Sequence, residues 1–345
     1  MPLKSDIIID AGKFDPANNP ERVNKFNETI TAMFNSAVDW YEVGAAKYRQ
    51  MRWAGETGFP VPPTLPQGIN ITIPSRESGR DIPCRIIYPT SRATEEDRKK
   101  CKGSILHFHG GGWTLGDERS QDALLESFAD AGDLAVISVG YRLAPEDPFP
   151  KAPEDCMDAA EYLIKNSERD YGGPLEFIGG ESAGAHLTLT TIFQLLKLYP
   201  NFKLSGLLLH CGCYDNSLLP QFLHMLYAPI LPQKQTLRFM HGFLPNMSTE
   251  QRKDPSVSPF YEDLSILRGR LPSALFTCGT EDPLLDDTVL MGTRWLMAGG
   301  EAIVKIYTGA PHGFLLFPPE VLAEAKTCLL HTKTFIQDRL AVRAS

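Results

Sequence analysis

The sequence predicts an α/β protein whose mostly parallel sheet is flanked by helices on both faces. Strands are expected at the short apolar runs 104–108, 134–139, 175–178, 204–211, 273–278 and 302–307. Helical segments separate these runs, and such alternation is typical of parallel strands joined by helical crossovers. A hairpin of 69–73 and 82–88, around turn residues 78–81, completes an expected sheet of eight strands.

Composition favours an ordinary soluble globular protein. The 345 residues suit one large α/β domain with a lid, and 43% of them are hydrophobic while 22% are charged. A formal charge of −8 disfavours nucleic acid or an anionic membrane surface as a partner. There is no uninterrupted apolar run of the length that a membrane span needs, so no span is expected.

The N-terminal residues and the cysteines together suggest a cytoplasmic protein. Residues 1–10 lack the long apolar core of a signal peptide. The seven cysteines are an odd number and are scattered, and the Cys211-x-Cys213 spacing fits no zinc site. We therefore expect reduced thiols in an intracellular protein and no bound metal.

The segment before the sheet has a helical pattern of its own. Apolar residues recur at helical spacing between positions 23 and 41, after the helix-start signal Asn-Pro-Glu at 19–21. Several prolines between 60 and 66 then interrupt the chain. The pattern predicts N-terminal helices that are separate from the sheet.

Residues 180–184 read Gly-Glu-Ser-Ala-Gly and lie between an apolar run and the amphipathic stretch 185–198. Strand, tight turn and helix form the context of a nucleophile elbow. Gly180 and Gly184 have no Cβ to clash in such a turn, and Ser182 stands at a helix N-terminus, where negative charge is stabilised. By itself the pattern also fits an ordinary strand-to-helix turn.

A run of three glycines follows the first parallel strand. Residues 109–113 read His-Gly-Gly-Gly-Trp directly after the apolar run 104–108. Consecutive glycines cost backbone entropy on folding, so they make sense where backbone N–H groups must point at a ligand. The strand before and the elbow after favour this role over that of a flexible loop.

Six motifs occur in a fixed order between about residues 70 and 335. They are HFHGGGW at 107–113, YRLAPE at 141–146 with FP at 149–150, GESAG at 180–184, DP and SP at 254–259, DPLLD at 282–286 and HGF at 312–314. In these motifs the chain resembles the hormone-sensitive-lipase-like family of serine esterases, within the α/β-hydrolase superfamily. One departure is visible: the family often has Gly-Asn where this chain has Ala185-His186, which bears on local packing.

The resemblance implies an α/β-hydrolase fold with a helical cap over the site. It divides the chain into an N-terminal helical cap segment (1–67), a first core part (68–213), a second cap segment (214–265) and a second core part (266–345). Aromatic side chains of the cap are candidates to line an acyl or alcohol pocket, with packing between cap and core as the alternative. They are Trp40, Tyr41, Phe239 and Phe243.

The resemblance also assigns the glycine loop to an oxyanion hole. In the superfamily the loop supplies N–H donors together with the residue after the nucleophile, which here is Ala183. We expect Gly111 and Gly112 to be the other donors and Gly110 to form the turn.

The base of a Ser-His-Asp triad must follow the nucleophile and the acid in the superfamily's chain order. His312 stands in a loop directly after the apolar run 302–307, at the strand end where ligands bind in open α/β sheets. His210 lies inside an apolar stretch and is expected to be buried and satisfied. The remaining histidines after Ser182 fall in the second cap segment or the last helix, and they are His224, His241 and His331.

The acid is expected between Ser182 and His312. The run 273–278 leads into Asp282. From the sequence alone, Asp286 and Asp287 remain alternative candidates for the acid. Their structural explanation is that negative charge is favourable at a helix N-terminus. The resemblance selects Asp282, the residue before Pro283. It would orient the imidazole and stabilise its cation without taking the proton.

Three further polar sites are expected to have structural roles. His186 follows the nucleophile by about one helical turn and is expected to pack beside the elbow. His109 is expected to orient the glycine loop. Residues 141–146 are expected to form a structural turn in which Arg142 and Glu146 make a partly buried pair.

The function implied by the resemblance is that of a carboxylic ester hydrolase. Ser182 would form an acyl-enzyme with short to medium acyl esters, and the partner would be a small-molecule ester, with no cofactor or metal. The alternatives are an acyltransferase, lactonase or amidase with the same triad, or a non-catalytic small-molecule receptor. The resemblance further implies a homodimer through the edge strand at 302–307.

Overall fold

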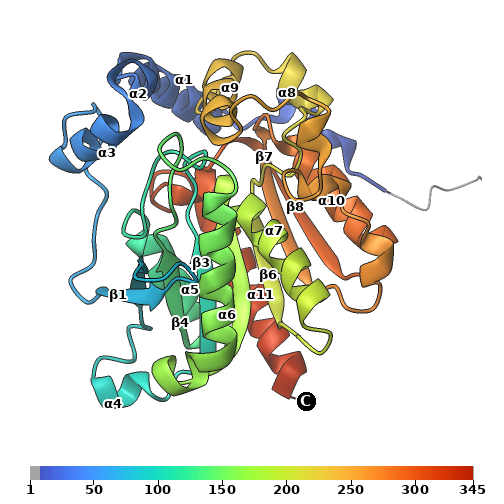
Figure 1. Ribbon diagram of the computed structural model, residues 1–345. Coiled ribbons are helices and arrows are strands. Elements are labelled where there is room, and N and C mark those ends of the chain that lie inside the picture. The colour runs from blue at the N-terminus through green and yellow to red at the C-terminus, as the bar shows by residue number, and fades with distance from the viewer. Residues whose placement is uncertain (1–7, 345) are drawn as a thin grey trace, which may run out of the picture.

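The computed structural model describes residues 8–344, so the first seven positions of the N-terminal stretch, on which the signal-peptide expectation partly rests, lie outside it. A single eight-stranded sheet runs through the molecule with helices on both faces (Figure 1). The predicted α/β architecture is therefore confirmed. Within residues 8–344 there is no helix with the length and apolarity needed to cross a membrane.

The strands occur in the sheet in the order β1-β2-β4-β3-β5-β6-β7-β8. Their bounds are β1 Ile69–Pro74, β2 Asp81–Ile87, β3 Gly103–Phe108, β4 Leu134–Val139, β5 Leu175–Glu181, β6 Gly206–His210, β7 Ala274–Glu281 and β8 Ala302–Pro311. β2 pairs antiparallel with β1 and with β4, and the other pairs are parallel. The carboxyl ends of the parallel strands consequently meet at one edge of the sheet.

Helices cover both faces of the sheet and one of its ends. The α-helices are α1 Glu21–Ser36, α2 Trp40–Val43, α3 Ala45–Ala54, α4 Glu95–Arg98, α5 Asp122–Gly132, α6 Lys151–Tyr171, α7 Ala183–Leu198, α8 Pro220–His224, α9 Gln233–Phe243, α10 Leu285–Met297 and α11 Ala323–Ala344. The 3-10 helices are η1 Ala11–Phe14, η2 Pro16–Asn18, η3 Gln251–Lys253, η4 Pro259–Tyr261, η5 Leu264–Leu267 and η6 Phe314–Leu316. The helix expected after the Asn-Pro-Glu signal is α1.

Two apolar layers make up most of the core, one on each face of the sheet. Leu163 of α6, Leu189 of α7 and Trp295 of α10 belong to one layer. Phe128 of α5 and Ile336 of α11 belong to the other. Strands β3, β4 and β5 are buried along their whole length because both of their faces are covered, which is usual for parallel strands.

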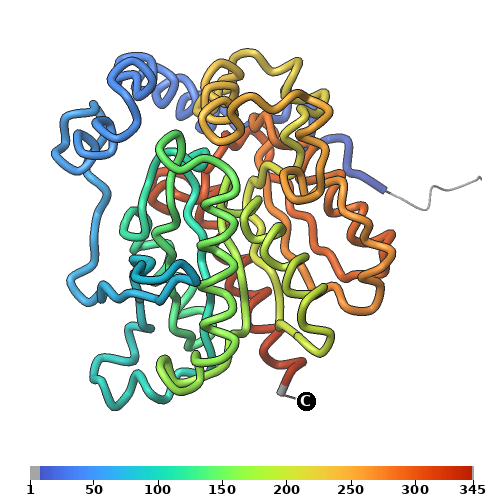
Figure 2. Tube along the Cα trace, viewed as in Figure 1, coloured from blue at the N-terminus to red at the C-terminus, as the bar shows by residue number. Residues whose placement is uncertain are grey.

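Two segments far apart in the sequence meet above the carboxyl ends of the strands. The tube in Figure 2 shows the blue helices α1 to α3 beside the yellow helix α9 at this end of the molecule. Arg238 of α9 forms an ion pair with Asp39, with 2.6 Å between Nη1 and Oδ2. Trp40 stacks on Phe239 with ring centroids 4.8 Å apart and donates to Gln235 over 3.0 Å.

Helix α3 is also bound to the loop that follows β3. The guanidinium of Arg49 donates to the carbonyl oxygen of Thr114 over 2.8 Å, and the indole of Trp53 donates to Asp117 over 2.7 Å. The N-terminal helices are thereby fastened both to α9 and to the segment that directly follows the glycine loop.

The expected pairing of Arg142 with Glu146 is wrong. Arg142 instead binds the buried carboxylate of Asp155 on α6, with 2.8 Å between Nη2 and Oδ1, and also Glu77. Glu146 pairs with Arg49 over 2.9 Å. Arg142 and Glu146 do not pair with each other, because α6 and α3 bring Asp155 and Arg49 to this turn from distant parts of the chain.

Candidate active site

Ser182 occupies a strained turn between β5 and α7. Its backbone has φ 56° and ψ −119°, a combination that costs a residue with a side chain some free energy. The turn is held by the Ser182 N–H, which donates to the carbonyl oxygen of His210 over 2.8 Å. Such strain persists only where the surrounding structure enforces it.

The two glycines of the G-x-S-x-G pattern answer a steric demand from β3. A Cβ at Gly180 would lie 2.2 Å from the carbonyl oxygen of Phe108, and one at Gly184 only 1.8 Å from the same atom. The turn thus packs directly on the carboxyl end of β3, so neither position can carry a side chain.

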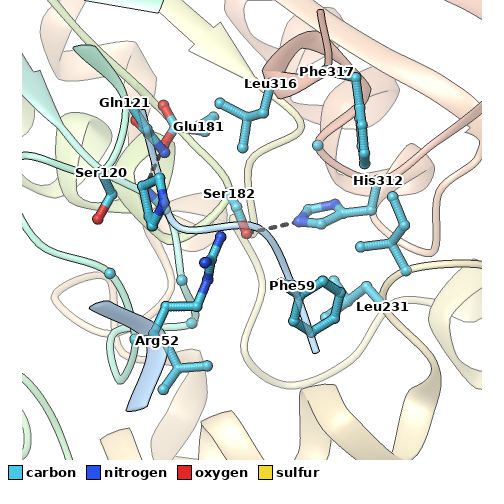
Figure 3. Close-up of a pocket in the computed structure, with 18 of the residues that line it drawn as sticks. Arg52, Phe59, Ser120, Gln121, Glu181, Ser182, Leu231, His312, Leu316 and Phe317 are labelled. Carbon is cyan, nitrogen blue, oxygen red and sulfur yellow. Dashed lines mark hydrogen bonds between the residues drawn. The ribbon is translucent and has the colours of Figure 1, made fainter. Parts of the chain in front are cut away.

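The structure brings Ser182, His312 and Asp282 together across the carboxyl ends of β5, β7 and β8. Nε2 of His312 lies 2.9 Å from Oγ of Ser182, as the dashed line in Figure 3 marks. Nδ1 of the same ring lies 2.9 Å from Oδ2 of Asp282. The other oxygen of Asp282 accepts the Leu284 N–H over 2.9 Å, so this fully buried carboxylate is held on both sides.

The rival carboxylates are occupied elsewhere. Asp286 accepts the Gln221 N–H over 2.8 Å. Asp287 accepts the N–H groups of Tyr214 and Asp215 over 2.5 and 2.8 Å. Burial raises the pKa of Asp287 well above its ordinary value. Both side chains therefore fasten the start of the 214–265 segment to α10.

The glycine loop lies against the elbow in a conformation that needs glycine. Gly111 and Gly112 have φ of 117° and 60°, and a Cβ on Gly111 would lie 2.1 Å from the carbonyl oxygen of Leu115. The Leu115 N–H donates back to the Gly111 oxygen over 2.8 Å and closes the loop. Gly111, Gly112 and Ser182 line one and the same cavity.

Glu181 is a site residue that sequence reasoning missed. Its buried carboxylate accepts the Gly110 N–H and the Gln121 amide, and its Oε2 lies 3.0 Å from Nε2 of His107. Burial would raise the pKa of Glu181, but His107 and the hydrogen bonds outweigh it and lower that pKa. The available signal was a charged residue at the carboxyl end of a buried strand, directly before the nucleophile.

Two histidines support the glycine loop, a role that was expected for His109 but not for His186, which was expected only to pack beside the elbow. The ring of His109 lies 2.7 Å from the Gly110 oxygen and stacks on Tyr141, with centroids 4.3 Å apart. Nδ1 of His186 accepts from the indole of Trp113 over 3.1 Å, and its Nε2 lies 2.8 Å from the carbonyl oxygen of Val257. Burial lowers the pKa of His186 to about 4, so a neutral ring links the glycine loop to the 214–265 segment.

The hydrogen bond of Ser182 Oγ is to His312, and the remaining histidines have other surroundings. His210 is buried, as expected, but only its Nδ1 is bonded, to Thr277 over 2.7 Å, and its Nε2 has no partner among residues 8–344. Burial lowers its pKa to about 4. His331 binds the Tyr307 hydroxyl over 2.8 Å, and His224 and His241 are exposed.

A cavity of about 850 Å³ opens onto Ser182 and His312. It extends between the glycine loop, the N-terminal helices and the 214–265 segment, and Figure 3 shows Phe59, Leu231 and Phe317 around it. Of the four aromatic candidates only Phe239 lines it. The other three pack elsewhere: Trp40 behind Phe239, Phe243 on Trp113 and Tyr41 at the surface.

One cluster in the described chain has the proximity of metal ligands: Cys211, Asp282 and His312, whose ligand atoms lie within 4.8 Å of one another. A metal would compete there with the two hydrogen bonds of His312. Burial raises the pKa of the Cys211 thiol well above its ordinary value, whereas metals bind the thiolate. All seven cysteines are buried free thiols, and these residues suit a metal poorly.

Comparisons with known sequences show the family to which the chain is similar. A family model for the alpha/beta hydrolase fold matches residues 105–316. Carboxylesterase NlhH of Mycobacterium tuberculosis is 28% identical over 84% of this chain and 87% of its own. An AB hydrolase superfamily protein of Schizosaccharomyces pombe is 29% identical over 74% of this chain and 76% of its own.

Solved structures show the same fold. The hyperthermophilic esterase of Pyrobaculum calidifontis superposes with a TM-score of 0.76 at 23% identity, over 93% of this chain and 98% of the esterase. A hormone-sensitive lipase from a metagenome library superposes with a TM-score of 0.74, also at 23% identity, over 93% and 99% of the two chains.

Proposed function

The chain belongs to the alpha/beta hydrolase fold family, and we propose that it is a carboxylic ester hydrolase of the hormone-sensitive-lipase-like type, with Ser182 as its nucleophile. One observation carries this proposal above the others. His312 lies 2.9 Å from Ser182 Oγ on one side and 2.9 Å from Asp282 Oδ2 on the other. A hydroxyl, a base and an orienting acid in hydrogen-bond reach of one another are what nucleophilic catalysis requires.

The chemistry proceeds through an acyl-enzyme. Nε2 of His312 takes the Ser182 proton while Oγ attacks the acyl carbon, and His312 then gives that proton to the departing alcohol. A water molecule, deprotonated by the same nitrogen, attacks the acyl-enzyme and releases the acid. Asp282 holds Nδ1 protonated and stabilises the imidazolium that forms in each half-reaction.

Backbone N–H groups stabilise the tetrahedral intermediates. We assign this oxyanion hole to Gly111, Gly112 and Ala183, which flank Ser182 from the glycine loop and from the first residue of α7. Removal of one such donor typically costs about 10²–10³ in turnover. The carboxylate of Glu181 supports the hole through the Gly110 N–H.

The substrate is a small ester with a short to medium acyl chain. The cavity of about 850 Å³ is of a size that suits small molecules, and most of its lining is apolar. We propose that segments 1–67 and 214–265 act as a cap over the core parts 68–213 and 266–345. A covered site disfavours attack on a lipid interface.

We further propose that the protein is a homodimer and is located in the cytoplasm. Strand β8 lies at an edge of the sheet, where it can pair with a second copy of the chain and form a homodimer. The buried free thiols suit a cytoplasmic protein. Sedimentation velocity would test the dimer, since a monomer at every protein concentration would contradict it.

Hydrolysis of a p-nitrophenyl ester series, from acetate to palmitate, tests the function. We expect the wild type to prefer short chains, and Ser182→Ala to lose at least about 10⁴-fold in turnover and all labelling by an organophosphate. Ser120→Ala is the matched control, because Ser120 lines the same cavity and should keep its labelling. Labelling of Ser182→Ala at the wild-type rate would refute the nucleophile.

A further inference from the structure

Among the charged side chains that line the cavity beside Ser182, Asp122 and Arg49 are paired with opposite charges, and Glu181 is held by hydrogen bonds. Asp122 is bound by Arg85, with 2.5 Å between Oδ2 and Nη2. Arg49 pairs with Glu146 over 2.9 Å. The carboxylate of Glu181 is taken by His107 and backbone N–H, as described above. These groups are held by partners within the fold and have no need of a ligand.

Arg52 is different. It lines the cavity from the last turn of α3, and among residues 8–344 no carboxylate pairs with it. Its Nη1 donates to the carbonyl oxygen of Pro60, and its guanidinium lies 5.9 Å from the centre of the Phe59 ring. Burial lowers the pKa of Arg52, although a guanidinium remains a cation at neutral pH.

The surroundings of Arg52 make an unpaired cation costly. The guanidinium lies beside the Phe59 ring, and Arg52 is partly buried in a cavity whose lining is mostly apolar. Partial removal of a charge from water is unfavourable unless a partner of opposite charge compensates it. If the only role of Arg52 were to pack against Phe59, an uncharged side chain such as Met would serve without that cost.

The direction of the side chain points to a ligand. Figure 3 shows Arg52 extending into the cavity toward Ser182, while His312 approaches Ser182 from another side. One carbonyl oxygen occupies only part of the donor set of a guanidinium, which is planar and matches a carboxylate with two parallel hydrogen bonds. The protein carries a formal charge of −8, so attraction of an anion to this site must come from a local cation.

We propose that the substrate is an ester that also carries a carboxylate, and that Arg52 binds this carboxylate while the ester group lies at Ser182. The inference rests on the proposed function and specifies its substrate class. The mostly apolar lining of the cavity accommodates the hydrocarbon part of the molecule. The carboxylate can belong to the acyl part, as in the half-ester of a dicarboxylic acid, or to the alcohol part, as in the ester of a hydroxybenzoic acid.

Matched pairs of esters test this substrate class. For the acyl part the pair is p-nitrophenyl hexanoate and the mono-p-nitrophenyl ester of adipic acid, which differ in a terminal carboxylate. For the alcohol part the pair is phenyl hexanoate and its para-carboxyphenyl counterpart. The measured quantity is the ratio of kcat/KM, charged over neutral ester, in wild type, Arg52→Met and Arg52→Lys.

We expect Arg52→Met to lower this ratio by about 10- to 100-fold in one of the two pairs, mostly through KM, because a hydrogen-bonded charge contributes about 1.5–3 kcal/mol. Arg52→Lys should restore part of the loss, since it keeps the charge without the planar fork. The pair that responds identifies the part of the substrate that carries the carboxylate. Arg169→Met is the matched control, because it removes one exposed positive charge on α6, remote from the cavity lining.

These measurements distinguish a failure of the carboxylate-binding inference from a failure of the proposed esterase function. If the wild type hydrolyses the neutral esters and Arg52→Met leaves both ratios unchanged, or lowers the rates for charged and neutral esters equally, Arg52 has a structural role and the inference is overturned. If the wild type hydrolyses none of the esters, the proposed function fails, and the substrate class fails with it.

Discussion

Glu181 and His107 form a buried pair at the carboxyl ends of β5 and β3, with 3.0 Å between Oε2 and Nε2. The carboxylate of Glu181 also accepts the Gly110 N–H. Ser182 directly follows Glu181 in the chain. One side chain therefore joins the elbow to the glycine loop. The distance between the nucleophile and the proposed oxyanion donors depends on this contact.

The Glu181→Gln variant should be less stable than the wild type by about 2–3 kcal/mol. The carboxylate offers two acceptor oxygens, to the Gly110 N–H and the Gln121 amide on one side and to His107 on the other. A glutamine amide has only one acceptor oxygen, and its NH₂ group would face a neighbour on the other side. At least one hydrogen bond to a charged group is therefore lost. Urea denaturation measures the free energy of unfolding. Glu168→Gln, an exposed change on α6, is the control, and equal stability of the two variants would contradict the structural role.

The choice of the acid is tested by a comparison of carboxylates. Asp282→Asn should lower turnover by about 10⁴-fold, because the amide favours the wrong tautomer of His312. Asp286→Asn should leave turnover close to that of the wild type, since Asp286 binds the Gln221 N–H and not the imidazole. Steady-state kinetics on a short p-nitrophenyl ester gives both values, and a larger loss in Asp286→Asn would mean that the acid is misassigned.

Gly184→Ala should destabilise the fold by about 1–3 kcal/mol or more and also lower turnover. Its Cβ would lie 1.8 Å from the carbonyl oxygen of Phe108, a backbone atom that cannot move aside without displacing β3. Gly242→Ala is the matched control, because a Cβ there meets no atom closer than 3.7 Å and α9 gains helix propensity. Thermal unfolding compares them, and similar melting temperatures would show that the elbow is not closely packed.

Acid sensitivity should depend partly on His210. Its pKa is lowered from 6.5 to about 4 by burial, so the unfolded chain binds a proton at a higher pH than the folded protein does. The stability contribution of the neutral ring is complete above pH 6.5 and is lost as the pH falls toward about 4. A variant without this histidine should lose that part of the pH dependence.

Denaturation of His210→Asn between these pH values measures the effect. The free energy of unfolding should fall less steeply with decreasing pH than in the wild type, by up to about 1.4 kcal/mol per pH unit. His224→Asn, at an exposed position of α8, controls for the loss of a histidine elsewhere. Parallel pH curves for His210→Asn and the wild type would contradict a buried neutral ring.

Most of the sheet was predictable, but strand ends were not. The apolar run 175–178 predicted β5, which continues to Glu181 although Gly179 and Gly180 have low strand propensity. The extension is stabilised by pairing, since Gly180 lies opposite Phe108 of β3 and Leu209 of β6. A local pattern contains no information about such neighbours.

The sequence by itself determined the α/β class, the strand–turn–helix around Ser182 and the glycine loop. Each of these features depends on the sterics and conformational preferences of residues that are adjacent in the chain. Tertiary structure decided what depends on distant residues: which carboxylate faces His312, which charges neutralise Arg142 and Glu146, and that Glu181 meets His107. It also left Arg52 in the cavity with no counter-charge from the described part of the chain, residues 8–344. Charges act through space, so their partners are known only once the chain is folded.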